Sequence, residues 1–202
     1  MTHDAYHYTA KPPEPGAPVI FAFHGTGADE HQFTGLIAQL RPDAGFVAPR
    51  GDVSENGANR FFRRTGEGVY DMDDLAARTA RMAGFIGAQK AAHPDTPIFA
   101  LGYSNGANIL ASVLFEAPEL FDRAVLMHPL IPWTPAPQPG LAGRRILITA
   151  GRRDPICPLP MTRALEDWFA AQGAQIELVL QDGGHEVAQA ELSAVQVALT
   201  ER

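Results

Sequence analysis

The sequence contains a single cysteine, Cys157, among its 202 residues. One thiol excludes an internal disulfide and a zinc site built on several cysteines, and it fits a reducing compartment. No run approaches the ~18 consecutive apolar residues that a membrane-spanning helix needs. The first residues also lack the basic start and apolar core of a secretory signal peptide. We therefore expect a cytoplasmic protein that does not span a membrane.

Positive charge is also scarce. The 16 lysines and arginines are outnumbered by 23 aspartates and glutamates, which gives a formal net charge of −7. Proteins that bind nucleic acid or an anionic membrane surface normally use a basic patch, so we expect neither partner. Hydrophobic residues at 46% and charged residues at 19% are typical of a globular chain. The length suits one core, so we predict a single domain over residues 1–202 and leave a homodimer open.

Six apolar segments have the character of buried strands. They are residues 19–23, 45–48, 97–101, 124–127, 146–149 and 176–180. Most are continuously apolar rather than alternating, which suits strands covered on both faces. Helical patterns lie between them, over residues 73–93, 105–115, 161–171 and 186–199. This alternation predicts an α/β fold with a mostly parallel central sheet and helices on both faces.

The segment Gly102-Tyr-Ser104-Asn-Gly106 ends one predicted strand and begins a predicted helix. This is the context of the nucleophile elbow, in which a serine lies on a sharp turn flanked by glycines. Residues two positions from the serine must be very small, because the strand and helix backbones approach there. The alternative is an ordinary glycine-containing turn with an incidental serine. We predict that Ser104 is a nucleophile.

A serine nucleophile needs a base, and the base needs a carboxylate that holds its tautomer. In this fold class the chain order is serine, acid, histidine. Asp154 and His185 each follow a predicted strand downstream of Ser104, so we predict them as acid and base. Asp182 is a weaker candidate because it shares a loop with His185. His128 ends a strand but precedes the acid in the chain order, so we do not predict it as the base.

Acyl transfer also requires hydrogen-bond donors for the developing oxyanion. The residue after the nucleophile, Asn105, is expected to supply one backbone N–H. We expect the second from Thr26, because the loop His24-Gly-Thr-Gly27 follows an early strand and its glycines let the backbone turn. His24 is predicted to brace this loop rather than to act as a base.

Residues 52–70 are predicted to leave the sheet, and the stretch 59–71 follows a strand end and is expected to overhang the site. Phe62 or Tyr70, or both, are predicted to form one wall of the substrate pocket, with Leu130 and Ile156 opposite. The alternative is that these aromatic side chains only hold the segment down. A chain of this length has no room for a large cap, so we predict a shallow pocket for short-acyl or aryl esters. Few methylenes would be buried there, each worth about 0.8 kcal/mol.

The chain resembles a known family in six segments: HGTGADE (24–30), PRG (49–51), RFFRRTGEGVYD (60–71), GYSNGAN (102–108), GRRD (151–154) and GH (184–185). They resemble the phospholipase/carboxylesterase group of α/β-hydrolases, which includes the acyl-protein thioesterases. The likeness is strongest to bacterial carboxylesterases associated with hydroquinone resistance. It implies a serine esterase whose elements fall on the residues named above. Few residues precede the first predicted strand, so we expect a sheet trimmed at that edge.

We therefore predict a carboxylic-ester hydrolase that acts on a small-molecule ester without a cofactor. We also predict no metal site, because the paired His3 and His7 have no acidic ligands beside them. Two other functions stay open. One is a thioesterase or lysophospholipase that acts on long acyl chains, and the other is a non-catalytic small-molecule binder on the same fold.

Overall fold

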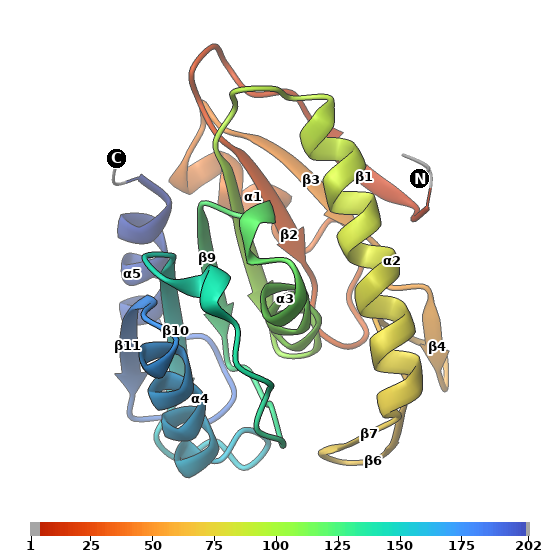
Figure 1. The fold of residues 1–202 in the computed structure, drawn as a ribbon, viewed down its shortest axis with the longest axis vertical. Helices are drawn as coiled ribbons and strands as arrows, with labels where there is room; N and C mark the ends of the chain where they lie inside the picture. The colour runs from red at the N-terminus through yellow and green to blue at the C-terminus, as the bar shows by residue number, and fades with distance from the viewer. Residues whose placement is uncertain (1–4, 201–202) are drawn as a thin grey trace.

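The computed structural model describes residues 5–200, and its central feature is a seven-stranded sheet within that range (Figure 1). The strand order is β1-β3-β2-β8-β9-β10-β11. In chain order the bounds are β1 Tyr8–Lys11, β2 Val19–Phe23, β3 Gly45–Pro49, β8 Ile98–Tyr103, β9 Arg123–Met127, β10 Arg145–Gly151 and β11 Gln175–Gln181. Only β1 is antiparallel to its neighbour, and the other pairings in this sheet are parallel. The carboxyl ends of the parallel strands therefore lie at one edge, where a ligand site is expected.

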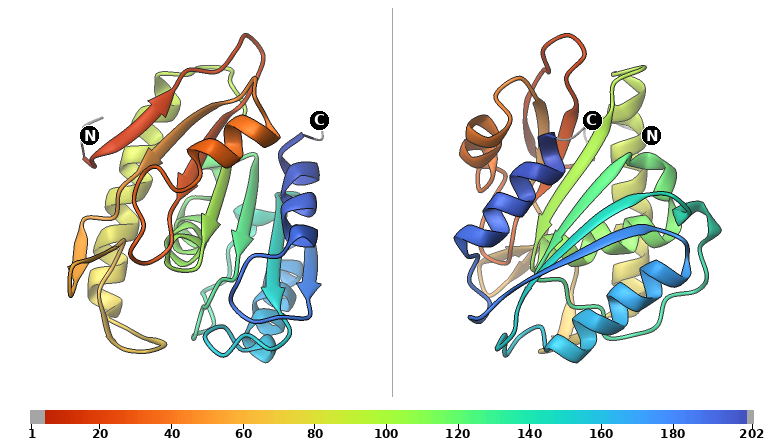
Figure 2. Two further views of the ribbon diagram at one scale, coloured as in Figure 1. Left: turned by 180° about the vertical axis from the view of Figure 1, so that it is seen from behind. Right: turned by 90° about the vertical axis from the view of Figure 1, so that its left-hand side faces the viewer.

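Helices cover both faces of the sheet. In Figure 1, α2 (Met72–Ala91), α3 (Asn105–Glu116) and α4 (Leu159–Ala171) lie in front of it. From behind, the left view of Figure 2 shows α1 (Thr34–Leu40) and α5 (Gln189–Thr200) on the opposite face. Short 3-10 helices span Pro118–Leu120 and Pro139–Leu141. The predicted α/β-hydrolase architecture is thus confirmed, and no large cap covers the sheet in the described part of the chain.

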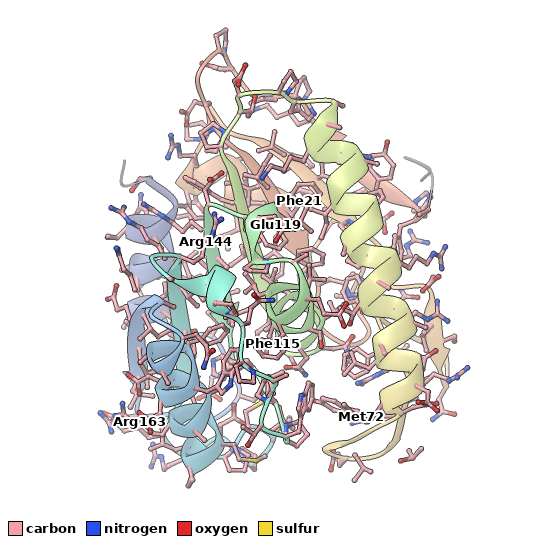
Figure 3. The ribbon with its side chains drawn as sticks, viewed as in Figure 1. Phe21, Met72, Phe115, Glu119, Arg144 and Arg163 are labelled. Carbon is pink, nitrogen blue, oxygen red and sulfur yellow. The ribbon has the colours of Figure 1, made fainter. Side chains whose placement is uncertain are left out.

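The core consists of one apolar layer on each side of the sheet. On the α2–α3–α4 side lies Phe115 of α3, which Figure 3 labels. Its ring centroid is 4.9 Å from that of Trp168 and 5.8 Å from that of Phe169, both on α4. On the other side, Ile37 of α1 and Val195 of α5 are buried in the second cluster. Every residue of β2 and β9 is buried, as expected for strands sandwiched between helices.

Three features of the fold were not predicted from the sequence. Strand β1 and helix α1 are short and partly exposed, so neither carries a long apolar pattern. At the predicted trimmed edge, β1 closes the sheet by antiparallel pairing with β3. Residues 52–70 fold as two hairpins, β4 (Val53–Glu55) with β5 (Ala58–Arg60) and β6 (Arg64–Gly66) with β7 (Val69–Tyr70).

Within residues 5–200, no helix combines the length and apolar character needed to cross a bilayer.

The β4–β5 turn shows which sequence signal identifies the first hairpin. Asn56 and Gly57 are its two central residues, and both have positive φ, at 52° and 87°. An Asn-Gly pair readily adopts this mirror-image turn, which matches the twist of the flanking strands. The pair therefore marks a hairpin in the sequence itself.

Candidate active site

The serine elbow is built by close approach of three backbone segments. Ser104 joins β8 to α3 with φ 52° and ψ −117°, a conformation that an L-residue rarely adopts. A Cβ added to Gly102 would lie 2.6 Å from the Gly106 carbonyl oxygen, and one added to Gly106 would lie 2.1 Å from that of Phe23. Only glycine fits at both positions, so the motif has the steric cause expected from the sequence.

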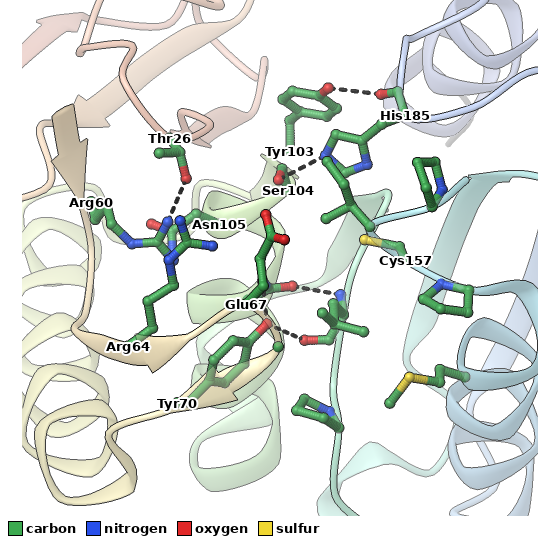
Figure 4. A pocket seen from close by; sticks show the side chains of 18 residues that line it. Thr26, Arg60, Arg64, Glu67, Tyr70, Tyr103, Ser104, Asn105, Cys157 and His185 are labelled. Atoms are coloured by element: carbon green, nitrogen blue, oxygen red, sulfur yellow. Dashed lines mark hydrogen bonds between the residues drawn. The ribbon is translucent and has the colours of Figure 1, made fainter. Parts of the chain in front are cut away.

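The structure brings Ser104, His185 and Asp154 into one hydrogen-bonded line. His185 Nε2 lies 2.9 Å from Ser104 Oγ, and His185 Nδ1 lies 2.7 Å from Asp154 Oδ2. Asp154 comes from the loop between β10 and α4, and His185 from the loop between β11 and α5. The hydroxyl of Tyr103 donates to the His185 carbonyl at 2.8 Å and so fixes the histidine loop (Figure 4).

Asp154 is buried and accepts hydrogen bonds on both carboxylate oxygens. Its Oδ1 accepts from the backbone N–H groups of Ile156 and Cys157, at 2.8 and 2.9 Å. Its Oδ2 faces His185 and also His128, whose Nδ1 is 2.9 Å away. Burial alone would raise the pKa of Asp154, but these donors outweigh it and hold the pKa below its usual value. The acid is therefore held as a carboxylate.

His128 belongs to the site, although the sequence argument set it aside. Its Nε2 lies 2.9 Å from Oε1 of Glu191 on α5, and the side chains of His128, Asp154 and Glu191 are all fully buried. Burial opposes the charged imidazole, but the Glu191 and Asp154 carboxylates outweigh it and raise the pKa of His128. The imidazole that contacts Ser104 Oγ is that of His185, whereas His128 contacts Asp154. No sequence pattern indicates that His128 contacts Glu191, which lies 63 positions later in the chain.

Thr26 and Asn105 both line the pocket beside Ser104. Among the described residues, no acceptor engages the backbone N–H of either one. The neighbouring N–H groups are occupied, because Gly25 donates to Gln32 Oε1 and Gly27 donates to the Asn59 carbonyl. The two N–H groups predicted as oxyanion donors are therefore free for a ligand.

His24 braces the loop that carries Thr26. Its Nδ1 lies 2.7 Å from the Gly25 carbonyl, and its Nε2 accepts from the Gly51 N–H at 2.9 Å. A ring with one donor and one acceptor nitrogen is neutral. Burial accordingly lowers the pKa of His24. The bracing role predicted from the sequence is the one that the structure shows.

A pocket of about 510 Å³ opens at the serine (Figure 4). Tyr70, Leu130 and Ile156 line it, as predicted. Tyr70 is held in place because its hydroxyl donates to the Leu130 carbonyl at 2.8 Å and accepts from Asn108 at 2.9 Å. Phe62 is not among the lining residues. It is fully buried behind Tyr70, with ring centroids 4.8 Å apart, so it supports the wall without forming it.

His128, Asp154 and His185 also offer ligand atoms within 4.8 Å of one another. Both imidazole Nδ1 atoms already hydrogen-bond the same carboxylate oxygen, so the geometry fits a hydrogen-bonded chain better than a metal ligand set. Of the two N-terminal histidines considered from the sequence, His7 is exposed and His3 lies outside the described residues.

Several known proteins resemble this chain in sequence or in fold. Hydrolase MhqD of Bacillus subtilis (strain 168) is 39% identical over 175 residues, which are 86% of this chain and 88% of that protein. The chain belongs to the α/β-hydrolase carboxylesterase family. The structure of a carboxylesterase from Bacillus cereus is 32% identical to this chain, with 96% of this chain and 93% of that chain covered and a TM-score of 0.88. None of the protein-family models matches the sequence.

A third similar protein has no stated activity. It is Atu2452 of Agrobacterium tumefaciens, described as of unknown function, at 54% identity with 97% and 96% of the two chains covered and a TM-score of 0.90. The family predicted from the sequence motifs is confirmed, and the chain is a hydrolase.

Asp182, the weaker candidate for the acid, has a side chain that is 91% exposed, whereas the side chain of Asp154 is buried.

Proposed function

We propose that this protein is a serine esterase that hydrolyses small carboxylic esters through an acyl-enzyme on Ser104. The observation that carries the proposal is the unbroken line from Ser104 Oγ through His185 to Asp154, at 2.9 and 2.7 Å. These are the contacts that a general base needs to take the serine proton while a carboxylate holds its tautomer.

The reaction follows from that geometry. His185 Nε2 takes the proton as Ser104 Oγ attacks the ester carbonyl carbon. The oxyanion accepts hydrogen bonds from the free N–H groups of Thr26 and Asn105, and the positive end of the α3 dipole favours the same charge. His185 then protonates the departing alcohol. Water then attacks the acyl carbon as His185 takes its proton, and His185 returns that proton to Ser104 Oγ as the bond to the acid breaks, so the reaction needs no cofactor.

The pocket supports short-acyl or aryl esters as substrates. Its volume of about 510 Å³ lies in the lower half of the range of ligand pockets, roughly 300–1,000 Å³. Tyr70 is fixed at one wall by two hydrogen bonds, which limits how far the pocket can open on that side. Acyl carbons beyond the first few would extend into solvent and gain little.

A fluorophosphonate probe and a panel of p-nitrophenyl esters with two to sixteen acyl carbons test the proposal. We expect labelling that disappears in Ser104→Ala, and kcat/KM that stops rising after a few carbons. A monotonic rise to sixteen carbons, measured below the micelle threshold, would support the long-chain alternative. An unlabelled protein that hydrolyses none of the esters would be a binder.

A further inference from the structure

Two arginines line the pocket on the side of Thr26, and they share one carboxylate. Arg60 Nε lies 3.1 Å from Glu55 Oε2, and Arg64 Nε lies 3.0 and 3.1 Å from the two oxygens of the same side chain. Arg60 and Arg64 line the pocket, whereas Glu55 does not. These three side chains together carry a net charge of +1, and the carboxylate of Glu67, which lines the same pocket, offsets it.

The outer nitrogens of these guanidinium groups are available to a ligand. Arg60 Nη1 donates to Thr26 Oγ1 at 2.9 Å. No acceptor among residues 5–200 engages Arg60 Nη2 or either Nη atom of Arg64. Figure 4 shows the two groups converging beside Asn105 and Thr26. Burial, and after it the charge of Arg64, lower the pKa of Arg60, while the Glu55 carboxylate acts in the opposite direction.

We infer that the pocket is built for esters that carry a carboxylate in addition to the ester group. The inference rests on the proposed esterase function. Guanidinium groups present pairs of N–H donors that match the two oxygens of a carboxylate. Since Arg60 is only 4% exposed, a bound carboxylate would interact with it in a partly desolvated setting, where charge pairs are stronger.

Substituting Glu67 should have the opposite effect on substrate preference to substituting Arg64. It lies on the β6–β7 hairpin, lines the same pocket and forms no ion pair with a described residue. Its carboxylate repels an anionic substrate, whereas Arg64 attracts one. Removing the charge of Glu67 and removing that of Arg64 should therefore change substrate preference in opposite directions.

The experiment compares matched esters that differ only in charge. One pair has the charge on the alcohol side: 4-acetoxybenzoate and its methyl ester. The other has it on the acyl side: mono-4-nitrophenyl adipate and its methyl ester. For each pair we measure the ratio of kcat/KM for the charged over the neutral ester. Comparing this ratio between variants cancels general damage to the site and differences in intrinsic reactivity.

We expect Arg64→Gln to lower the ratio about tenfold or more for at least one pair, as expected for loss of a partly buried charge contact. Glu67→Gln should raise it, and salt should lower it in the unmodified protein by screening. Arg63→Gln is the matched control, because Arg63 is adjacent in sequence but exposed and absent from the pocket lining. It should leave the ratio unchanged.

Two failures are distinguishable. If the neutral esters are hydrolysed and Arg64→Gln leaves both ratios unchanged, the carboxylate inference is wrong while the esterase function stands. If neither ester of either pair is hydrolysed and Ser104 is not labelled by the fluorophosphonate, the esterase function itself is wrong.

A second inference concerns His128 and Glu191 and stands on different observations. Asp154 Oδ2 faces two imidazoles, and behind one of them Glu191 Oε1 lies 2.9 Å from His128 Nε2. Glu191 is anchored in turn, because its Oε2 accepts from the Ala188 N–H at 2.7 Å. The buried side chains of Asp154, His128 and Glu191 thus connect the β10–α4 loop, the end of β9 and helix α5. They lie behind His185, the proposed base.

We propose that His128, held by Glu191, is a positioning residue that keeps the Asp154 carboxylate aimed at His185. Backbone donors fix only Oδ1 of Asp154, so without His128 the other oxygen has His185 as its one partner. The rings of His128 and His185 also pack edge to face, with centroids 5.1 Å apart. Losing His128 would loosen both the carboxylate and the ring that it orients.

The double variant His128→Phe, Glu191→Leu tests this role without leaving a buried charge unpaired. We expect a folded protein with an unchanged KM and a kcat lowered about tenfold. A tenfold change corresponds to the free energy of one hydrogen bond from an N–H group to a carboxylate. His128→Gln in the Glu191→Leu background restores a donor and should recover part of kcat. A folded double variant with unchanged kcat would overturn the proposal.

Proton NMR of the unmodified protein with ¹⁵N-labelled histidine gives a second readout that does not depend on how the variants fold. We expect two strongly hydrogen-bonded imidazole N–H resonances at low field, one from His185 and one from His128. A single such resonance would show that Asp154 has only one imidazole partner and would also overturn the proposal.

Discussion

At the residue scale, the proposed chemistry depends on Ser104 and His185 as a unit. Ser104→Ala should lower kcat by at least ~10³, because no other group can replace the attacking hydroxyl. His185→Ala should cost about as much, since members of one catalytic unit are not additive. Steady-state rates on a p-nitrophenyl ester, with circular dichroism to verify folding, give the measurement. If His185→Ala retained more than about a tenth of kcat, another residue would be the base.

The choice of acid is tested by a matched pair of substitutions. Asp154→Asn should lower kcat by roughly 10⁴, because an amide would favour the wrong tautomer of His185. Asp182→Asn should have almost no effect, since that side chain is exposed and, among the described residues, its one ion pair is with Arg152. Both kcat/KM values would be compared with that of the unmodified enzyme. A larger loss in Asp182→Asn would move the acid to that position.

At the scale of elements, the crossing of β2 with the start of α3 decides which residues the elbow tolerates. Gly106→Ala would place a Cβ 2.1 Å from the Phe23 carbonyl oxygen, so backbone must move. We expect a loss of about 3 kcal/mol in the free energy of unfolding and a parallel loss of kcat. Urea unfolding followed by circular dichroism measures the first quantity.

Gly35→Ala in α1 is the control for that substitution. A Cβ there meets nothing within 4 Å, and alanine favours a helix over glycine. Stability should stay the same or rise by up to about 1 kcal/mol. Equal destabilisation by the two substitutions would contradict the steric explanation of the elbow.

At the scale of the whole molecule, acid stability depends on carboxylates held in their charged form. Glu30 is 3% exposed and hydrogen-bonded to Arg50, and that bond lowers the pKa of Glu30 to about 2. A carboxyl whose pKa falls on folding stabilises the folded state above its unfolded pKa, here about 4.5. That contribution is lost as pH falls through about 2.

Glu30→Gln should therefore lower Tm at pH 7, and the difference from the unmodified protein should shrink as pH falls from about 4.5 towards 2. Calorimetric scans of both proteins across this range provide the comparison. A Tm difference that stayed constant with pH would show that the Glu30 carboxylate does not contribute through its charge.

The sequence by itself determined the elements with strong local patterns. The six apolar strand segments and four helices appear close to their predicted bounds, and the glycine spacing around Ser104 predicted the turn that the structure contains. Chain order was enough to select Asp154 and His185, which the fold brings to the serine. These features are readable because each depends on a periodicity or on steric needs within a few residues.

Tertiary structure alone decided what depends on residues distant in sequence. Strand β1 forms because β3 offers a free edge, Glu55 is shared by Arg60 and Arg64 across two hairpins, and His128 meets Glu191 only after α5 packs on the sheet. Phe62 and Tyr70 are both buried and in ring contact, yet only Tyr70 lines the pocket. The physical reason is common to all four: burial and charge pairing are set by which side chains the packed sheet brings within a few ångströms, and local sequence does not encode that distance.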